Sequence, residues 1–129
     1  MILFLDTSTP SCHIWLDDKS FEYQTDRNLA KDLLWLINES IRASGLDPKR
    51  RMLECISAII VFRGPGSFTG LRIGINVANT LADYLGVPII GTTGKSWRTE
   101  AQKRLAKGEN DKLVLPIYDK PANITEPIK

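Results

Sequence analysis

The chain has 129 residues, of which 43% are hydrophobic and 25% are charged, and its formal net charge is +2 at pH 7. This length fits one domain with a modest core, and the small net charge does not indicate a dedicated nucleic-acid-binding protein. The sequence has two cysteines and no apolar run of membrane-spanning length. It therefore predicts neither a disulfide framework nor a membrane span, and we expect a cytoplasmic protein.

The N-terminal part of the sequence predicts three strands followed by a helix. The strands are expected at residues 2–7, 12–16 and 21–25. The polar residues 17–20 are typical of a hairpin turn between the second and third strands. From residue 28 to residue 44 apolar residues recur at helical spacing, and Gly45 follows as a residue that readily ends a helix.

The middle of the sequence predicts a buried strand, a second helix and a further short strand. The continuous apolar run at residues 56–62 indicates a strand that is covered on both faces. A helix is expected at 71–85, ending near Gly86, and a short strand at 87–90. Because three antiparallel strands precede strands that alternate with helices, we expect a mixed five-stranded sheet and an α/β fold.

The C-terminal part predicts one more helix and an extended tail. Residues 96–107 form a basic helical pattern that stops at Gly108, and residues 113–118 indicate another strand. Prolines keep the remaining tail extended. The basic residues are more typical of a solvated helix face than of an RNA-binding surface. We expect a single domain over residues 1–129: one lobe, a basic helix and a tail.

A glycine-rich loop joins the buried strand to the second helix. Three glycines among seven residues imply backbone angles or close approaches that a side chain would block. Thr69 is a candidate N-cap for the helix that follows. Free N–H groups and the positive end of a helix dipole meet at such a loop, so it is either an anion-binding site or a structural turn. The candidate anion-binding residues are Gly64, Gly66, Ser67, Thr69 and Gly70.

Catalytic residues are hard to assemble from this sequence. His13 is the single histidine and lies in an apolar strand, where histidine is more often a packed residue than a base. Asp6 follows the first strand, and we expect it to cap the next turn rather than to hold Mg²⁺ near a phosphate. His13, Cys12 and Cys55 lack the spacing of a metal site. We therefore expect no catalytic residue and no metal.

The segment 91–96 resembles a phosphate-binding loop because it follows a strand and contains Gly-Lys-Ser. A P-loop requires a glycine five positions before its second glycine, and that position is Ile89. We therefore expect an ordinary strand-to-helix turn at this place, and no cofactor.

The two central helices carry more apolar surface than a small domain needs. The apolar arc of the first helix covers roughly half of its circumference, and Trp35 lies on the opposite side among charged residues. In the second helix Gly74, Ala78 and Ala82 recur every four residues, which lets either the sheet of the same domain or a partner helix approach closely. We expect a protein–protein interface here. Its candidate residues are Leu34, Trp35, Ile41, Ile73, Gly74, Val77, Ala78 and Ala82.

The string Arg63–Gly74, RGPGSFTGLRIG, resembles the signature of the bacterial TsaB (YeaZ-like) family. The opening residues 2–8, ILFLDTS, and the segment 86–91, GVPIIG, agree with that resemblance. It implies an actin-like N-terminal lobe, a shortened replacement of the family's second lobe, and a C-terminal strand and tail. These parts correspond to residues 1–92, 93–112 and 113–129.

The resemblance implies an actin-like ATPase fold built on an RNase H-like sheet, in a member without most of the second subdomain. It implies a non-catalytic subunit of tRNA threonylcarbamoyladenosine biosynthesis, which activates a homologous catalytic threonylcarbamoyltransferase subunit acting on the adenosine next to the anticodon. The resemblance also implies that a small ATPase subunit joins that pair. We expect tRNA to contact this chain indirectly, and whether it also touches the chain directly stays open. Two alternatives stay open: a small nucleotide-binding ATPase or phosphotransferase that uses the glycine loop, and a homodimeric module that pairs through the same helices.

Overall fold

The computed structural model describes residues 1–25, 28–45, 52–66 and 68–117. The five-stranded sheet and the three α-helices expected from the sequence are present. In chain order the elements are β1 (Ile2–Asp6), β2 (Ser11–Leu16), β3 (Lys19–Gln24), α1 (Leu29–Ala43), the 3₁₀ helix η2 (Met52–Cys55), β4 (Ala58–Phe62), α2 (Phe68–Leu85), β5 (Ile89–Thr92) and α3 (Trp97–Ala106).

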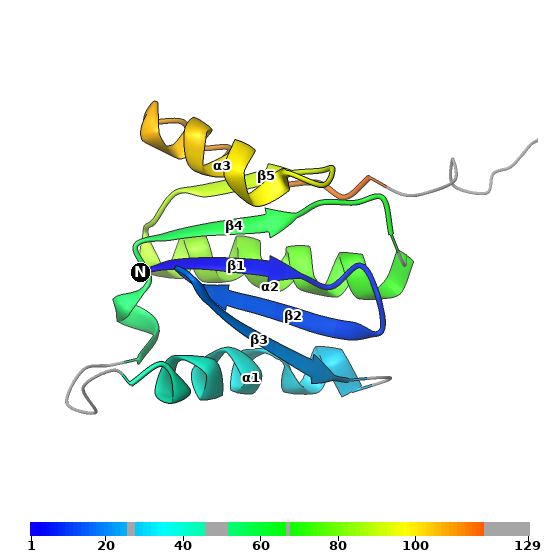
Figure 1. Ribbon diagram of the computed structural model, residues 1–129. Helices are drawn as coiled ribbons and strands as arrows, with labels where there is room; N and C mark the ends of the chain where they lie inside the picture. Colours follow the sequence, from blue (N-terminus) through cyan, green and yellow to red (C-terminus); the bar gives the residue numbers. More distant parts are fainter. Residues whose placement is uncertain (26–27, 46–51, 67, 118–129) are drawn as a thin grey trace, which may run out of the picture.

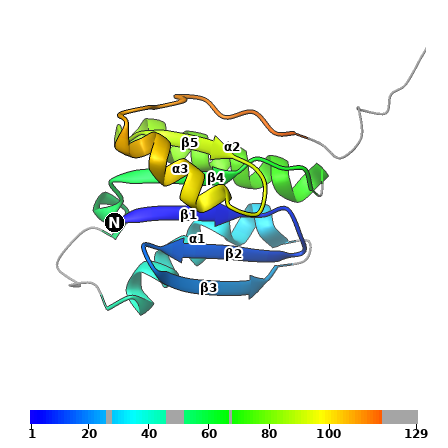
Figure 2. The ribbon, with the colours of Figure 1, turned by 45° about the horizontal axis from the view of Figure 1, so that its top comes forward.

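The strands form one mixed sheet in the order β3-β2-β1-β4-β5 (Figure 1). β1 pairs antiparallel with β2, and β2 pairs antiparallel with β3, whereas β1, β4 and β5 are parallel neighbours. Helices α1 and α2 cover one face of this sheet, and α3 lies on the other face over β4 and β5 (Figures 1 and 2). The sheet is therefore the middle layer of three.

The alternation of side chains along the strands divides the core into two layers. The larger layer fills the space between the sheet and the helices α1 and α2, with residues such as Leu5, Ile14 and Ile75. A smaller layer, which includes Phe4 and Trp97, lies between the sheet and α3. No helix in the described part of the chain has the length and apolar character needed to cross a lipid bilayer.

Several strand boundaries differ from those expected, most of all in β3, β4 and β5. β3 begins at Lys19 rather than at residue 21, because Lys19 and Ser20 already pair with β2, so the expected turn at 17–20 is shorter. β4 begins at Ala58 rather than at residue 56, because the preceding residues form η2 and its approach to the sheet. β5 begins at Ile89 rather than at residue 87, since Pro88 has no N–H for a strand ladder and contributes only its C=O, which accepts from the Ile59 N–H at 2.9 Å. None of these shifts changes which strands are neighbours in the sheet.

Residues 111–117, here called the C-terminal strap, run from α3 past β5 toward the glycine loop (Figure 2). The strand predicted at 113–118 is wrong over its described part, because the N–H and C=O of Val114 and the C=O of Leu115 bond to side chains and not to a neighbouring strand. The Asn79 side chain donates to the Val114 C=O and accepts from the Val114 N–H, both at 2.9 Å. Tyr118 and the rest of the tail lie outside the described residues.

Further hydrogen bonds hold the two ends of the strap. At its start, the Asp111 carboxylate accepts hydrogen bonds from Arg104 of α3 and from the Gly91 N–H, the latter at 2.9 Å. Burial raises the pKa of Asp111, but the hydrogen bonds from Arg104 and Gly91 outweigh it, so this pKa lies below its usual value. At the far end, the Ile117 N–H donates to the Arg63 C=O at 2.7 Å. The strap is thus fixed along its length.

Asn79→Ala is expected to loosen the strap, because Val114 is buried and would be left with an unpaired N–H and C=O. Two lost hydrogen bonds of about 1 kcal/mol each predict a free energy of unfolding lower by about 2 kcal/mol. Urea unfolding measures this loss, and hydrogen exchange at the Val114 amide should accelerate. Asn76→Ala, at an exposed position one turn away, is the control, and equal losses for both variants would contradict the prediction.

Candidate protein-interaction site

The glycine loop is packed against other parts of the chain. A Cβ at Gly66 would lie 2.4 Å from the Ser8 Cβ, in the turn after β1. At Gly64, where φ is +117°, a Cβ would lie 2.0 Å from the Ile117 carbonyl oxygen of the strap. The Thr93 hydroxyl also donates to the Gly64 C=O. These two glycines therefore let the β1–β2 turn and the strap approach the loop closely.

The other candidate residues of this loop have different positions. Ser67 lies outside the described residues. Thr69 is exposed within the first turn of α2, which begins at Phe68, so the expectation that Thr69 is the N-cap is wrong. The Gly70 C=O accepts a hydrogen bond of 2.7 Å from the buried Thr7 hydroxyl. The described contacts of the loop are contacts within the chain, and its anion-binding role stays a prediction.

The small-residue ridge of α2 faces the sheet of the same domain. Ala78 and Ala82 are buried in the main core, and a Cβ at Gly74 would lie 2.0 Å from the Thr7 Oγ1. Ile41 of α1 is also fully buried in that core. The sequence-based assignment of these four residues to a partner interface is therefore wrong, because the domain's own packing already uses the close approach that small residues permit.

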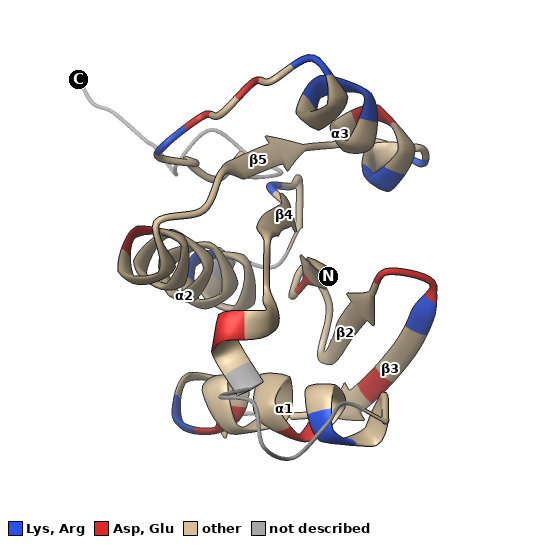
Figure 3. Cartoon of the chain, turned by 90° about the vertical axis from the view of Figure 1, so that its left-hand side faces the viewer, with Lys and Arg blue, Asp and Glu red and all other residues tan. Residues whose placement is uncertain are grey.

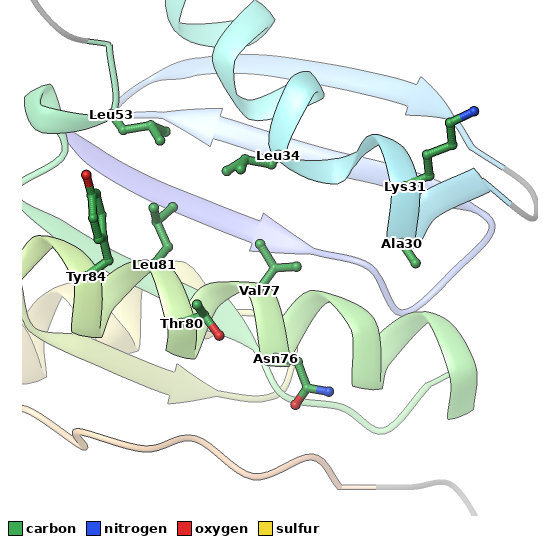
Figure 4. Close-up of a pocket in the computed structure, with 9 residues that line it drawn as sticks. All are labelled: Ala30, Lys31, Leu34, Leu53, Asn76, Val77, Thr80, Leu81 and Tyr84. Atoms are coloured by element: carbon green, nitrogen blue, oxygen red, sulfur yellow. The ribbon is translucent and has the colours of Figure 1, made fainter.

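On the exposed surface of the two helices, an apolar groove lies between α1 and α2. This α1–α2 groove has a volume of about 690 Å³, and Leu34 of α1 and Val77 and Leu81 of α2 point into it (Figure 4). Leu34 of α1 and Tyr84 of α2 line this groove, and 47% and 76% of their surface is exposed. It is lined by Ala30, Lys31, Leu34, Leu53, Asn76, Val77, Thr80, Leu81 and Tyr84.

Trp35 extends the groove along α1. As expected from the sequence it is exposed, at 61%, and it lines an adjoining hollow together with Tyr84 and Leu53. Glu39 and Arg42 border this hollow and form an ion pair at 3.5 Å. Aromatic and aliphatic anchors inside a polar rim are the arrangement typical of protein-binding surfaces.

The structure brings some of the expected interface residues together and leaves others apart. Leu34, Trp35 and Val77 lie at the groove or its extension, whereas Ile73 is partly buried against the core. Leu53 was not predicted, because it comes from η2, a single short turn whose four residues carry no helical periodicity.

The residues considered for catalysis have structural contacts. The His13 ring stacks on Trp15 at a centroid distance of 4.1 Å, and its Nε2 lies 3.1 Å from the Ser20 hydroxyl. Asp6 accepts hydrogen bonds from the N–H and hydroxyl of Ser8, as a turn cap does. Among the described residues, no three His, Cys, Asp or Glu side chains are grouped as metal ligands would be.

The segment 91–96 and Cys12 also have structural positions. The segment 91–96 joins the end of β5 to the start of α3, which confirms a strand-to-helix turn. Cys12 is buried in β2, and burial, with a smaller contribution from Asp6, raises the pKa of its thiol to about 12. A thiol with that pKa stays protonated at neutral pH and is a poor nucleophile.

Comparison with known proteins identifies the family. The model of the family described as "TsaD: tRNA N6-adenosine threonylcarbamoyltransferase" matches residues 23–123. The chain belongs to the TsaD family. Its RNase H-like, actin-like fold is shared with YeaZ from Pseudomonas aeruginosa, at a TM-score of 0.59 and 29% identity over 83% of this chain and 49% of that one.

Curated relatives agree with this placement of the TsaD-family chain. It is 36% identical over 125 residues to the tRNA threonylcarbamoyladenosine biosynthesis protein TsaB of Bacillus subtilis, which covers 92% of this chain and 49% of the relative. It is 33% identical over 113 residues to the TsaB of Haemophilus influenzae, covering 84% of this chain and 46% of the relative. The resemblance to TsaB and YeaZ proteins is confirmed, and the chain spans about half the length of the curated relatives it matches.

Proposed function

We propose that this chain takes part in the biosynthesis of threonylcarbamoyladenosine in tRNA, as a subunit that binds and activates a homologous catalytic threonylcarbamoyltransferase. The α1–α2 groove carries the proposal, because it offers exposed Leu34, Trp35 and Tyr84 beside a cavity of about 690 Å³. Apolar patches of this kind on a small domain are typical of partner-binding sites. The names of the TsaB relatives supply the pathway.

A non-catalytic role fits the chemistry of the described side chains. His13, Asp6 and Cys12 are engaged in stacking, turn capping and core packing. Gly64 and Gly66, which would border a phosphate at the glycine loop, lie against Ile117 and Ser8 instead. On this proposal the catalytic subunit performs the transfer, a small ATPase subunit joins the pair, and tRNA is held mainly by the partner.

Reconstitution tests the proposal. The catalytic subunit, the small ATPase subunit, ATP and tRNA are incubated with an activated threonylcarbamoyl donor, and modified adenosine is measured with and without this chain. We expect little product without the chain and at least about tenfold more with it, which corresponds to about 1.4 kcal/mol. The chain alone is expected to leave ATP unchanged. Equal product in both mixtures, or ATP turnover by the isolated chain, would contradict the proposal.

A further inference from the structure

Helix α3 and the residues next to it carry the positive charge of the chain. Residues 95–112 hold six of its 17 Lys and Arg but three of its 15 Asp and Glu, so their net charge is +3 and that of the remaining chain is −1. The basic positions lie along α3 and in the segment that follows it (Figure 3). The α1–α2 groove lies on the opposite face of the sheet, so a partner in the groove does not explain this charge.

The acidic residues of this segment neutralise two of its basic residues. Glu100 pairs with Lys103 at 3.5 Å, whereas Glu109 and Asp111 both pair with Arg104. The other four cations are exposed and have no ion-pair partner among the residues that the structure describes. They are Lys95, Arg98, Lys107 and Lys112. An excess of unpaired cations on one surface attracts polyanions.

Arg98 is held by aromatic rings of the sheet rather than by a carboxylate. The carbon of its guanidinium lies 4.3 Å from the centroid of the Trp15 ring, which is a cation–π distance. His13 stacks on the same ring at a centroid distance of 4.1 Å. A cation–π contact orders the guanidinium without using its N–H donors, so Arg98 can still bind an anion. The structure thus places cations beside aromatic rings, which the sequence did not predict.

The sheet surface beside this stack extends beyond α3. Helix α3 packs mainly on β4 and β5, whereas β2 and β3 lie to one side of it on that face (Figure 2). Trp15 and His13 alternate with buried residues of β2 and are themselves partly exposed. On the neighbouring strand, Ser20 lies opposite Trp15 and Glu22 lies opposite His13. A ligand bound along α3 can therefore reach the aromatic stack as well.

We propose that this surface, here called the α3 face, contacts tRNA directly. It consists of Lys95, Arg98 and Lys107 together with His13 and Trp15. RNA fits both parts of it, because phosphates bind cations and unpaired bases stack on aromatic and guanidinium planes. An acidic protein would use the cations alone. That the RNA is tRNA rests on the proposed function, and so few cations give a weak contact that adds to the binding of tRNA by the catalytic subunit.

Fluorescence anisotropy with a labelled tRNA transcript and the isolated chain tests the α3 face. Each phosphate contact releases counterions, so the affinity should fall at least about tenfold between about 50 mM and 200 mM salt. At the lower salt concentration Arg98→Glu and Lys107→Glu should each reduce the affinity at least about fivefold. Arg72→Glu, the same change of charge at an exposed position of α2, should change it by less than about twofold because salt screens distant charges.

Glu22→Gln gives a test of opposite sign. Glu22 is exposed and lies opposite His13 on the neighbouring strand, so its charge repels a phosphate at the stack. Removing that charge should raise the affinity for tRNA about twofold or more. A purely structural role of the aromatic stack does not predict such a gain. Circular dichroism checks that every variant is folded.

Three outcomes would overturn the proposal. They are equal losses for Lys107→Glu and Arg72→Glu, no measurable tRNA binding at the lower salt concentration, and displacement of the labelled tRNA by polyglutamate as readily as by unlabelled tRNA. The catalytic subunit is absent from this titration, so the result does not depend on the reconstitution. Failed reconstitution with the expected affinities would count against the proposed function alone, and the reverse pattern would count against the α3 face alone.

Discussion

Leu34→Asp is expected to weaken binding of the catalytic subunit at least about 100-fold, equivalent to about 2.8 kcal/mol. Leu34 is 47% exposed in the isolated chain and stands at the α1–α2 groove, so a bound partner helix would enclose it. A carboxylate at this place would have to lose its hydration without gaining a partner of opposite charge. Titration calorimetry with the purified catalytic subunit measures the loss, and modified tRNA should fall in parallel.

Leu115→Asp is the matched control for this prediction. It makes the same chemical change at an exposed leucine, on the strap and on the other side of α2. Substitutions at such positions change the free energy of unfolding by about 0.5 kcal/mol or less, so both variants should stay folded. Comparable affinity losses for the two variants would contradict the assignment of the α1–α2 groove as the surface that binds the catalytic subunit. An unchanged affinity for Leu34→Asp would remove the main support for that assignment.

The helical pattern identified the apolar faces of α1 and α2 but not what covers each part of them. Leu34 and Trp35 were correctly expected at the surface. The expectation that Gly74, Ala78 and Ala82 contact a partner was wrong. A stripe of small residues permits close approach by a partner helix and by the domain's own sheet alike, so the pattern does not decide between them. In the structure the stripe packs against the domain's own sheet, and Ala78 lies in the main core. A bulky residue such as Ala78→Trp would therefore test the core rather than the interface.

The strap shows a second limit of local patterns. The apolar run at 113–117 indicates an extended chain, and that much of the expectation is right. Whether an extended segment joins a sheet depends on hydrogen-bonding partners distant in sequence. Here they are the side chains of Asn79 and Arg63, 35 and 52 residues away from the strap residues they hold. By contrast, the mixed five-stranded sheet was expected from strong local periodicity and from connection rules that admit few alternatives.

Gly74→Ala is expected to lower the free energy of unfolding by about 2 kcal/mol, although helix propensity alone predicts the opposite sign. Replacing glycine by alanine within a helix normally stabilises it by about 1 kcal/mol. At this position the new Cβ would lie 2.0 Å from the Thr7 Oγ1 and 2.8 Å from its Cγ2. Overpacking in a dense core costs about 1–3 kcal/mol, and a contact this short belongs at the upper end. Urea unfolding of the variant and of the wild-type chain measures whether the free energy of unfolding falls or rises.

A double-mutant cycle with Thr7→Ala separates the steric cause from other effects of Gly74→Ala. Thr7→Ala removes both the Oγ1 and the Cγ2 that the new methyl group meets, at the cost of the Thr7 hydroxyl bond to the Gly70 C=O. If the clash dominates, Gly74→Ala should be less harmful in the Thr7→Ala background, with a coupling energy of about 1 kcal/mol or more. Additive effects would mean that α2 accommodates the methyl group by moving. The close approach of α2 to β1 would then not be what requires glycine at position 74.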